Sequence, residues 1–288
     1  MTGTGALVLV GTPIGNLGDL SPRAVEALAA SDVVCCEDTR RTGRLLKHVG
    51  VHAPKLLTVN DHTEGRVVDD VVARVAAGQR VAVVSDAGMP GISDPGETLV
   101  AAVIAAGLAV EVVPGPSAVV TALVLSGLPA GRFAYEGFLP RKGSGRTERL
   151  AAVAAEPRTV VLYEAPHRVA RTVADLARAC GGERRVALAR ELTKLHEEVW
   201  RGTLEGAIAR LAEHPPLGEF VVVLDGAPPP VEVDDDTVAA EARAALASGL
   251  SPRDAAADVA TTLGIPKRRA YAAVNALGAP PAGRPTAG

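Results

Sequence analysis

The feature that most constrains the fold is a series of five short runs rich in Val and Leu within the first 116 residues. Each run is bounded by Gly, Pro or Asp, and segments with helical periodicity, such as SPRAVEALAAS, lie between the runs. Continuous apolar runs of this length are typical of strands that are buried on both faces of a parallel sheet. The pattern predicts a doubly wound α/β layer, with strands at 6–11, 32–38, 55–59, 80–86 and 109–115.

A second group of strands follows a predicted helix over 117–127 and has fewer helices between its members. The last three strands are joined by few residues, which favours a mixed, partly antiparallel sheet. A chain of 288 residues is long enough for two cores. We therefore expect an N-terminal parallel α/β domain over 1–116 and a second α/β domain with a mixed sheet over 117–226, its strands at 133–138, 158–164, 184–191, 197–204 and 218–226.

The C-terminal region differs from both in composition. GAPPPVEVDDD is rich in Pro and then acidic, as extended linkers are. Three short segments that begin near Thr, Ser or Pro and end in Gly follow it, which predicts three helices. We expect a linker over 227–236, a helical, helix-turn-helix-like module over 237–278 and a disordered tail over 279–288.

The charge balance limits how this chain could hold a nucleic acid. The formal net charge is −3 and aromatic residues make up 2% of the chain, which argues against a global basic field and against a base-stacking platform. Contacts with RNA would have to come from local basic segments. The stronger of these is RKGSGRTER, read as a flexible loop that clamps phosphates; a helix beginning near Asp38 or Thr39 and the last predicted helix carry others, for which a solvated face is the alternative. The RNA-binding candidates are Arg40, Arg41, Arg44, Arg141, Lys142, Arg146, Arg149, Lys267, Arg268 and Arg269.

Cysteine and histidine usage gives no indication of a metal. Cys35 and Cys36 are adjacent within a predicted strand, so their side chains point to opposite faces and are unsuited to a zinc site. The N-terminus lacks the pattern of a signal peptide, and no uncharged run approaches the length needed to span a bilayer. We expect a cytoplasmic protein with reduced thiols, no metal and no membrane contact.

Two glycine-containing loops follow predicted strands at the edge where parallel sheets bind ligands. In GTPIGNLGD the glycines have the wrong spacing for a dinucleotide fingerprint, and no phosphate-loop lysine follows. In VSDAGMPGISDPGETLV, residues 85–88 are predicted to form a ligand-facing turn. Asp94 and Pro95 fit an N-cap and a first helical residue.

Seven motifs together resemble, in their order along the chain, those of the ribosomal RNA small subunit methyltransferase I family, a branch of the tetrapyrrole methylase superfamily. They are TPIGNLGD, EDTRRTGRLL, VSDAGMPGISDPG, VPGPSA, YEGFLPRKG, ARELTKLHEE and GEFVVVL. The resemblance covers roughly residues 6–278. It departs from the family at 91–93, where bulkier or amide residues are common.

The resemblance implies two α/β domains of the tetrapyrrole methylase (class III) type, with S-adenosyl-L-methionine in the cleft between them and a small C-terminal helical module. It also implies a homodimer that methylates the 2′-hydroxyl of a cytidine in the decoding region of 16S rRNA, in free RNA or in the 30S subunit. The cofactor-binding residues expected by similarity are Pro13, Asp86, Ala87, Gly88, Ile92, Ser117, Ala118 and Leu192, with Glu219 and Phe220 on the far wall.

No residue is assigned as the general base by the resemblance. A ribose hydroxyl is a poor nucleophile and benefits from a base or from hydrogen bonds to the developing alkoxide. Our candidates are Asp38 or Glu37 at the end of the second strand, with Asp61, His62 and Lys194 behind them. A helix cap or a structural ion pair is the alternative for each.

Two other functions remain open from the sequence. One is methylation of a tetrapyrrole, which would not need the basic segment at 141–149 or the C-terminal helices. The other is a non-catalytic RNA-binding protein of ribosome assembly, which would not need intact loops at 83–99 and 114–118.

Overall fold

The computed structural model describes residues 5–52, 55–59, 64–229 and 233–278. The chain divides into two compact units, Met1–Ala227 and Pro228–Gly288. Asp61 and His62, two of the candidate residues for proton transfer, and the tail 279–288 lie outside the described residues.

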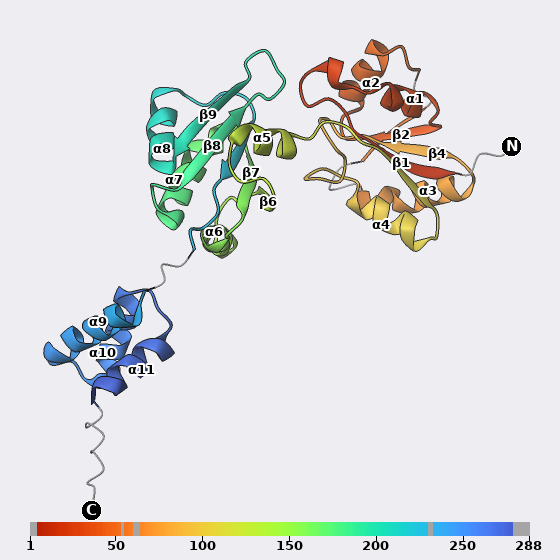
Figure 1. The fold of residues 1–288 in the computed structure, drawn as a ribbon. Coiled ribbons are helices and arrows are strands. Elements are labelled where there is room, and N and C mark those ends of the chain that lie inside the picture. The colour runs from red at the N-terminus through yellow and green to blue at the C-terminus, as the bar shows by residue number, and fades with distance from the viewer. Residues whose placement is uncertain (1–4, 53–54, 60–63, 230–232, 279–288) are drawn as a thin grey trace, which may run out of the picture. The chain divides into compact units, whose positions relative to one another are not determined.

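The first sheet has the strand order β3-β2-β4-β1-β5 and all its pairings are parallel, as predicted. Figure 1 shows its strands β1, β2 and β4 between helices α1 and α2 on one side and helices α3 and α4 on the other. Helices cover both faces: α1 and α2 pack on one, α3 and α4 on the other. Cys36 is buried in the first of these cores and Cys35 in the second, which confirms that they point to opposite faces. The elements are β1 Ala6–Val10, η1 Leu17–Asp19, α1 Pro22–Ala29, β2 Val33–Cys36, α2 Thr39–His48, β3 Leu56–Thr58, α3 Glu64–Ala76, β4 Arg80–Val83, α4 Glu97–Ala105 and β5 Ala109–Val113.

The second sheet has the order β6-β7-β10-β8-β9 and is mixed, also as predicted. β6 and β7 are parallel, and the other pairings are antiparallel. Helices α6, α7 and α8 contribute to the core on one face, and α5 packs on the other. The elements are α5 Ala118–Ser126, β6 Phe133–Phe138, α6 Ser144–Ala155, β7 Thr159–Glu164, α7 Pro166–Cys180, β8 Arg185–Arg190, β9 Glu198–Thr203, α8 Leu204–Glu213 and β10 Phe220–Leu224.

Two local predictions within this unit are wrong. Asp94 does not cap a helix, because α4 begins at Glu97 with Gly96 as its N-cap residue. The carbonyl of Pro95 instead accepts a hydrogen bond from Gly91 N at 3.1 Å, which closes a turn before the helix starts. The segment 141–149 is not a loop throughout, because α6 begins at Ser144.

The C-terminal unit is a bundle of three helices, α9 Asp235–Ala247, α10 Pro252–Thr262 and α11 Lys267–Gly278, around an Ala- and Val-rich core. The Asp234 side chain caps α9 by accepting a hydrogen bond from Thr237 N at 2.6 Å. The helix therefore starts two residues before the module boundary that we expected. Among the described residues, no helix is both long and apolar enough to cross a bilayer.

Candidate functional site

Three loops meet at the carboxyl ends of β1, β4 and β5, where open α/β sheets bind ligands. Thr12 N donates to Gly88 O at 2.9 Å, and Gly88 N donates to Thr12 O at 3.2 Å. Gly11 and Gly115 approach so closely that a Cβ on Gly11 would lie 2.6 Å from the Gly115 Cα atom. Glycine is required at this contact because backbone meets backbone there.

A fourth loop, between β8 and β9, packs against the first. A Cβ on Gly15 would lie 2.9 Å from Leu192 O and 2.4 Å from Lys194 Cγ. Glu191 and Thr193 adopt positive φ angles of 49° and 65°, a conformation that non-glycine residues take only when their surroundings enforce it. The Glu191 carboxylate provides such a restraint, since it accepts hydrogen bonds from Glu219 N at 2.8 Å and from Lys194 Nζ at 2.9 Å.

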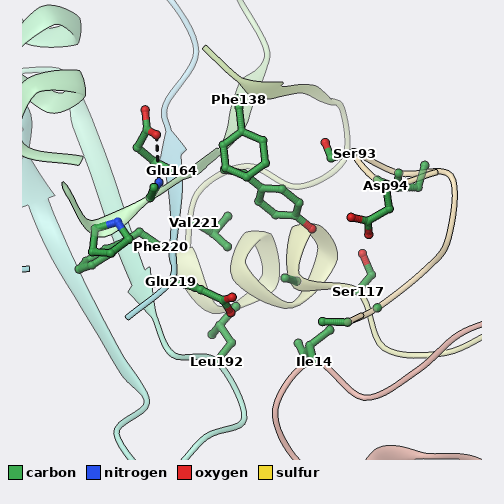
Figure 2. A pocket seen from close by; sticks show the side chains of 18 of the residues that line it. Ile14, Ser93, Asp94, Ser117, Phe138, Glu164, Leu192, Glu219, Phe220 and Val221 are labelled. Carbon is green, nitrogen blue, oxygen red and sulfur yellow. Dashed lines mark hydrogen bonds between the residues drawn. The ribbon is translucent and has the colours of Figure 1, made fainter. Parts of the chain in front are cut away.

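These loops enclose a cavity of about 430 Å³, shown in Figure 2, which lies within the usual range for small-molecule sites. Most of its lining is apolar, with a few acidic and hydroxyl groups among the aliphatic and aromatic side chains. The structure brings together eight of the ten expected cofactor residues in this lining: Ala87, Gly88, Ile92, Ser117, Ala118, Leu192, Glu219 and Phe220.

Lys194 also lines this cavity, which we call the larger cavity. Its Nζ lies 2.8 Å from Glu219 Oε2. Burial alone would lower the pKa of Lys194, but its bonds to Glu219 and Glu191 outweigh burial and raise the pKa. Lys194 is thus a fixed positive charge at neutral pH. It cannot accept a proton from a substrate hydroxyl in that state.

Several residues that line the cavity were not predicted as site residues from the sequence, among them Ser93, Tyr163 and Asp94. Ser93 has a positive φ of 61°, and its Oγ lies 2.6 Å from the hydroxyl of Tyr135. Burial raises the pKa of both Tyr135 and Tyr163, so both phenols stay protonated at neutral pH. No sequence pattern predicts a positive φ at this serine, so its place in the site could not be predicted.

Glu164 was missed as well, although a signal was present. It is the last residue of β7 and is 2% exposed. Its carboxylate accepts hydrogen bonds from Thr172 Oγ1 at 2.6 Å and from Ala165 N at 2.9 Å, and it lies 3.1 Å from Arg168 Nε. A polar residue at the carboxyl end of a buried strand, as in VVLYEAPHR, indicates the edge where α/β sheets bind ligands.

Two of the expected cofactor residues, Pro13 and Asp86, are placed elsewhere. They line a smaller cavity of about 190 Å³, together with Thr12, Leu17, Arg41, Thr42, Arg44, Leu45 and Ser85. They therefore lie apart from the other eight, and their role in cofactor binding stays a prediction. The reason is local: the turn after β4 directs Asp86 toward α2, whereas the next two residues, Ala87 and Gly88, face the larger cavity.

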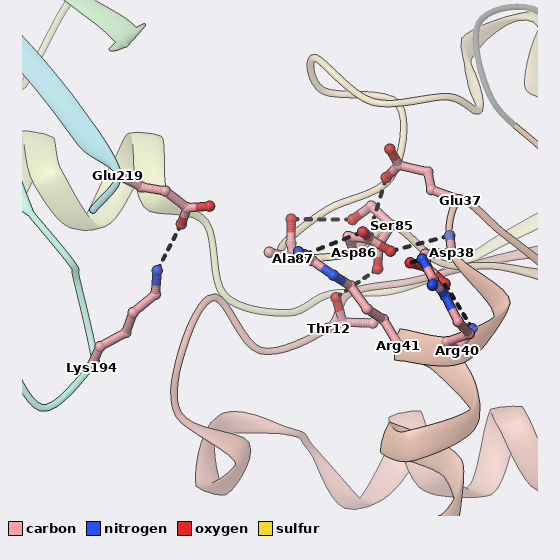
Figure 3. A network of polar contacts seen from close by, with 10 residues as sticks. All are labelled: Thr12, Glu37, Asp38, Arg40, Arg41, Ser85, Asp86, Ala87, Lys194 and Glu219. Carbon is pink, nitrogen blue, oxygen red and sulfur yellow. Dashed lines mark hydrogen bonds and ion pairs between the residues drawn. The ribbon is translucent and has the colours of Figure 1, made fainter. Parts of the chain in front are cut away.

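Polar contacts link Asp86 to the end of β2 and the start of α2 (Figure 3). Asp86 N donates to Glu37 Oε1 at 3.1 Å, and Asp38 N donates to Asp86 Oδ1 at 3.3 Å. Arg41 Nη1 lies 3.3 Å from Asp86 Oδ2. Glu37 and Asp38 therefore hold the turn that separates the two cavities.

Asp38 is the N-cap residue of α2. Its carboxylate accepts a hydrogen bond from Arg40 N at 2.8 Å and pairs with Arg40 Nη2 at 2.9 Å. The hydrogen bond from the Arg40 side chain, then that from its backbone, lowers the pKa of Asp38 to about 2. A carboxylate with so low a pKa is a weak base, so the geometry favours the cap over proton transfer.

The cations predicted to contact RNA differ in their exposure and in their ion pairs. Arg146, expected to touch RNA, is 5% exposed and bonded to Asp175, which contradicts that role. Arg149 Nε lies 2.5 Å from Glu136, and Arg269 is paired with Asp235. The remaining candidates have exposed side chains: Arg40, Arg41, Arg44, Arg141, Lys142, Lys267 and Arg268.

A cluster of three or more His, Cys, Asp or Glu side chains that could hold a metal was not found among the described residues.

Comparison with known proteins identifies the family. The model of the Tetrapyrrole (Corrin/Porphyrin) Methylases matches residues 6–208. A protein of Synechocystis called ribosomal RNA small subunit methyltransferase I is 46% identical over 269 residues, which cover 93% of this chain and 96% of that protein. The chain belongs to this family. A protein of the same name from Escherichia coli O157:H7 is 42% identical, with 93% of each chain covered.

Solved structures agree on the fold of the family. Uroporphyrin-III-C-methyltransferase from Thermus thermophilus has a TM-score of 0.54 at 25% identity, covering 76% of this chain and 94% of that one. Diphthine synthase has a TM-score of 0.59 at 16% identity, covering 76% and 90%. The predicted class III methyltransferase fold is confirmed.

S-adenosylmethionine is the methyl donor of this family of methyltransferases, and a structural neighbour with a TM-score of 0.53 is a complex with S-adenosyl homocysteine. The larger cavity fits this molecule chemically. Ile14, Leu192 and Val221 offer apolar contacts for the adenine ring, while Asp94 and Glu219 offer carboxylates for hydroxyl and amino groups.

Proposed function

We propose that this protein methylates the 2′-hydroxyl of a cytidine ribose in the decoding region of 16S rRNA, in free RNA or in the 30S subunit, with S-adenosylmethionine as the donor. The observation that carries the proposal is the larger cavity, where eight residues chosen for cofactor binding lie together. The acceptor rests on the relatives, whose shared name is ribosomal RNA small subunit methyltransferase I.

The chain's own residues would act mainly by positioning. When bound, S-adenosylmethionine supplies an electrophilic methyl group on a sulfonium. The loop residues Gly88, Ser117 and Leu192 would orient it, held by the Thr12–Gly88 bonds and by the contact of Gly15 with the β8–β9 loop. Fixing two reactants in line can supply a large part of the rate acceleration. Among the candidate bases, Glu37, Asp61 and His62 stay predictions.

The proposal includes a homodimer, supported by α5. Its sequence, AVVTALVLS, is apolar on every side, which is typical of a helix that is covered all round. One side packs on the second sheet, yet Val120 and Val124 are 50% and 69% exposed. A second copy of the chain would cover them.

Exposed cations would provide the contacts with RNA in the cytoplasm: Arg40, Arg41 and Arg44 on α2, Arg141 and Lys142 before α6, and Lys267 and Arg268 on α11. Such contacts make affinity depend on salt. The three-helix unit suits this role because Lys267 and Arg268 lie outside its apolar core and are exposed.

The test is methyl transfer from tritiated S-adenosylmethionine to three acceptors: 30S subunits from a strain that lacks this gene, free 16S rRNA, and uroporphyrinogen III. We expect label on RNA in at least one of the first two arms, mapped by mass spectrometry to a cytidine 2′-oxygen. Label on the tetrapyrrole alone would support the alternative enzyme. Binding of RNA without transfer in any arm would support the non-catalytic assembly protein.

A further inference from the structure

The smaller cavity shares no lining residue with the larger cavity, but consecutive residues of the chain line the two. Pro13 and Ile14 are consecutive and line the smaller and the larger cavity, respectively. The same holds for Asp86 and Ala87 in the turn after β4. A group bound in the smaller cavity would therefore lie beside the methyl donor, separated from it by two short loops.

The chemistry of the walls suits one nucleotide. Arg41 and Arg44 are three residues apart on α2, so they lie on the same side of the helix and can reach one anion. Leu17, Leu45 and Pro13 form apolar wall, and Leu17 is 47% exposed at this surface. Thr12, Ser85 and Asp86 add polar groups.

The two arginines differ in whether their guanidinium groups already form an ion pair. Arg41 is paired with Asp86 at 3.3 Å, and its side chain remains 58% exposed. For Arg44, no ion pair is found within the part of the chain that the structure describes. A guanidinium with exposed N–H groups beside a cavity is well suited to a phosphate, which it can bind through two parallel hydrogen bonds.

We infer that the smaller cavity binds the sugar and phosphate of one nucleotide of the acceptor RNA, next to the nucleotide that is methylated. Arg44 contacts the phosphate, Arg41 supports it, and Asp86 accepts a hydrogen bond from a sugar hydroxyl. The inference rests on the proposed function, because it assumes an RNA acceptor. It assigns the cofactor and the acceptor strand to two different cavities that share the loops at 12–14 and 85–88.

A matched pair of charge substitutions tests this. Arg44→Gln and Lys47→Gln each remove one positive charge from the exposed side of α2, but Lys47 is not among the residues that line the cavity. With 30S subunits from the deletion strain as the probe, we expect KM to rise about tenfold for Arg44→Gln, the size expected for one charge-assisted hydrogen bond, and to stay within about twofold for Lys47→Gln. Arg44→Lys, which keeps the charge, should recover part of the loss.

Calorimetry with S-adenosylmethionine on the same variants separates the two claims. We expect the cofactor Kd to be unchanged for Arg44→Gln. Equal KM changes for Arg44→Gln and Lys47→Gln would overturn the inference and leave the proposed function intact. No transfer to RNA by the wild-type enzyme would overturn the proposed function, and a weaker cofactor Kd for Arg44→Gln would place the smaller cavity in the cofactor site and overturn the inference.

Discussion

Two segments of this chain, EDTRRTGRLL and RKGSGRTER, have similar densities of arginine but different structural roles. In the first, Arg41 and Arg44 stay exposed on α2 and border a cavity. In the second, Arg146 is buried under α7, while Arg141 and Lys142 remain exposed. Charge density in a sequence therefore does not tell which cations are available to a ligand.

The neighbouring helix decides the difference. Arg146 Nε and Nη2 donate to Asp175 Oδ2 at 2.9 and 2.7 Å, and Nη2 also donates to Thr172 Oγ1 at 3.1 Å. Nη1 donates to Pro140 O at 2.9 Å. Both side-chain partners lie on α7, more than 25 residues away, and Thr172 in turn bonds to Glu164 at the rim of the larger cavity.

The largest expected effect is on stability, at Arg146. Arg146→Ala should lower the free energy of unfolding by about 3 kcal/mol, because it removes the buried partner of the Asp175 carboxylate and leaves only the exposed Arg171 and Arg178 beside it. Urea denaturation measures this. Lys142→Ala, an exposed cation in the same segment, should change stability by no more than about 0.5 kcal/mol. A loss below about 1 kcal/mol for Arg146→Ala would show that its charge is not structural.

Replacing both partners sharpens the same point. The double variant Arg146→Met with Asp175→Leu should be more stable than Arg146→Ala, because a buried ion pair can be exchanged for apolar side chains at little cost. Chemical denaturation of the double and both single variants provides the measurement. A double variant as unstable as the sum of the singles would contradict an energetic coupling between them.

Arg149 should behave in between. It pairs with Glu136 at 2.5 Å, but its side chain is 52% exposed, so the pair is screened by solvent. Arg149→Ala should cost about 0.5–1 kcal/mol in urea denaturation, more than Lys142→Ala and less than Arg146→Ala. A cost as large as that of Arg146→Ala would mean that exposure does not distinguish the two arginines.

The smallest effect concerns Asp38 on α2. Asparagine also caps helices, so Asp38→Asn removes mainly the charge that pairs with Arg40. Since the folded-state pKa is lowered from 3.8 to about 2, the contribution of this charge is present above pH 4 and is lost as pH falls toward 2. Melting curves of wild type and variant should differ by a constant amount from pH 7 to 4 and converge below. A difference that grows as pH falls would contradict the lowered pKa.

The strands could be predicted from the sequence because their signal is local. Residues 6–10 and 80–83 are continuous apolar or near-apolar runs. Such runs are typical of strands that are buried on both faces of a parallel sheet. Most of the expected cofactor residues were also found, because loops at the carboxyl ends of such strands meet at one edge. The division into domains near residue 116 stays a prediction.

What the sequence could not predict depends on contacts between distant segments or on loop geometry. The burial of Arg146 requires knowing that α7 lies against α6, and the position of Asp86 requires knowing that α2 lies beside the turn after β4. Asp94 had the sequence of a helix cap, but the bond from Gly91 N to Pro95 O delays the helix. No pattern within a few residues encodes these arrangements.

The central claim is that the larger cavity holds S-adenosylmethionine, and calorimetric titration in the presence of EDTA tests it most directly. We predict saturable binding to the wild-type protein. Ala118→Leu, which fills the cavity at the start of α5, should abolish this binding, whereas Ala101→Leu on the exposed side of α4 should not. No heat at millimolar cofactor, or equal binding by both variants, would contradict the account.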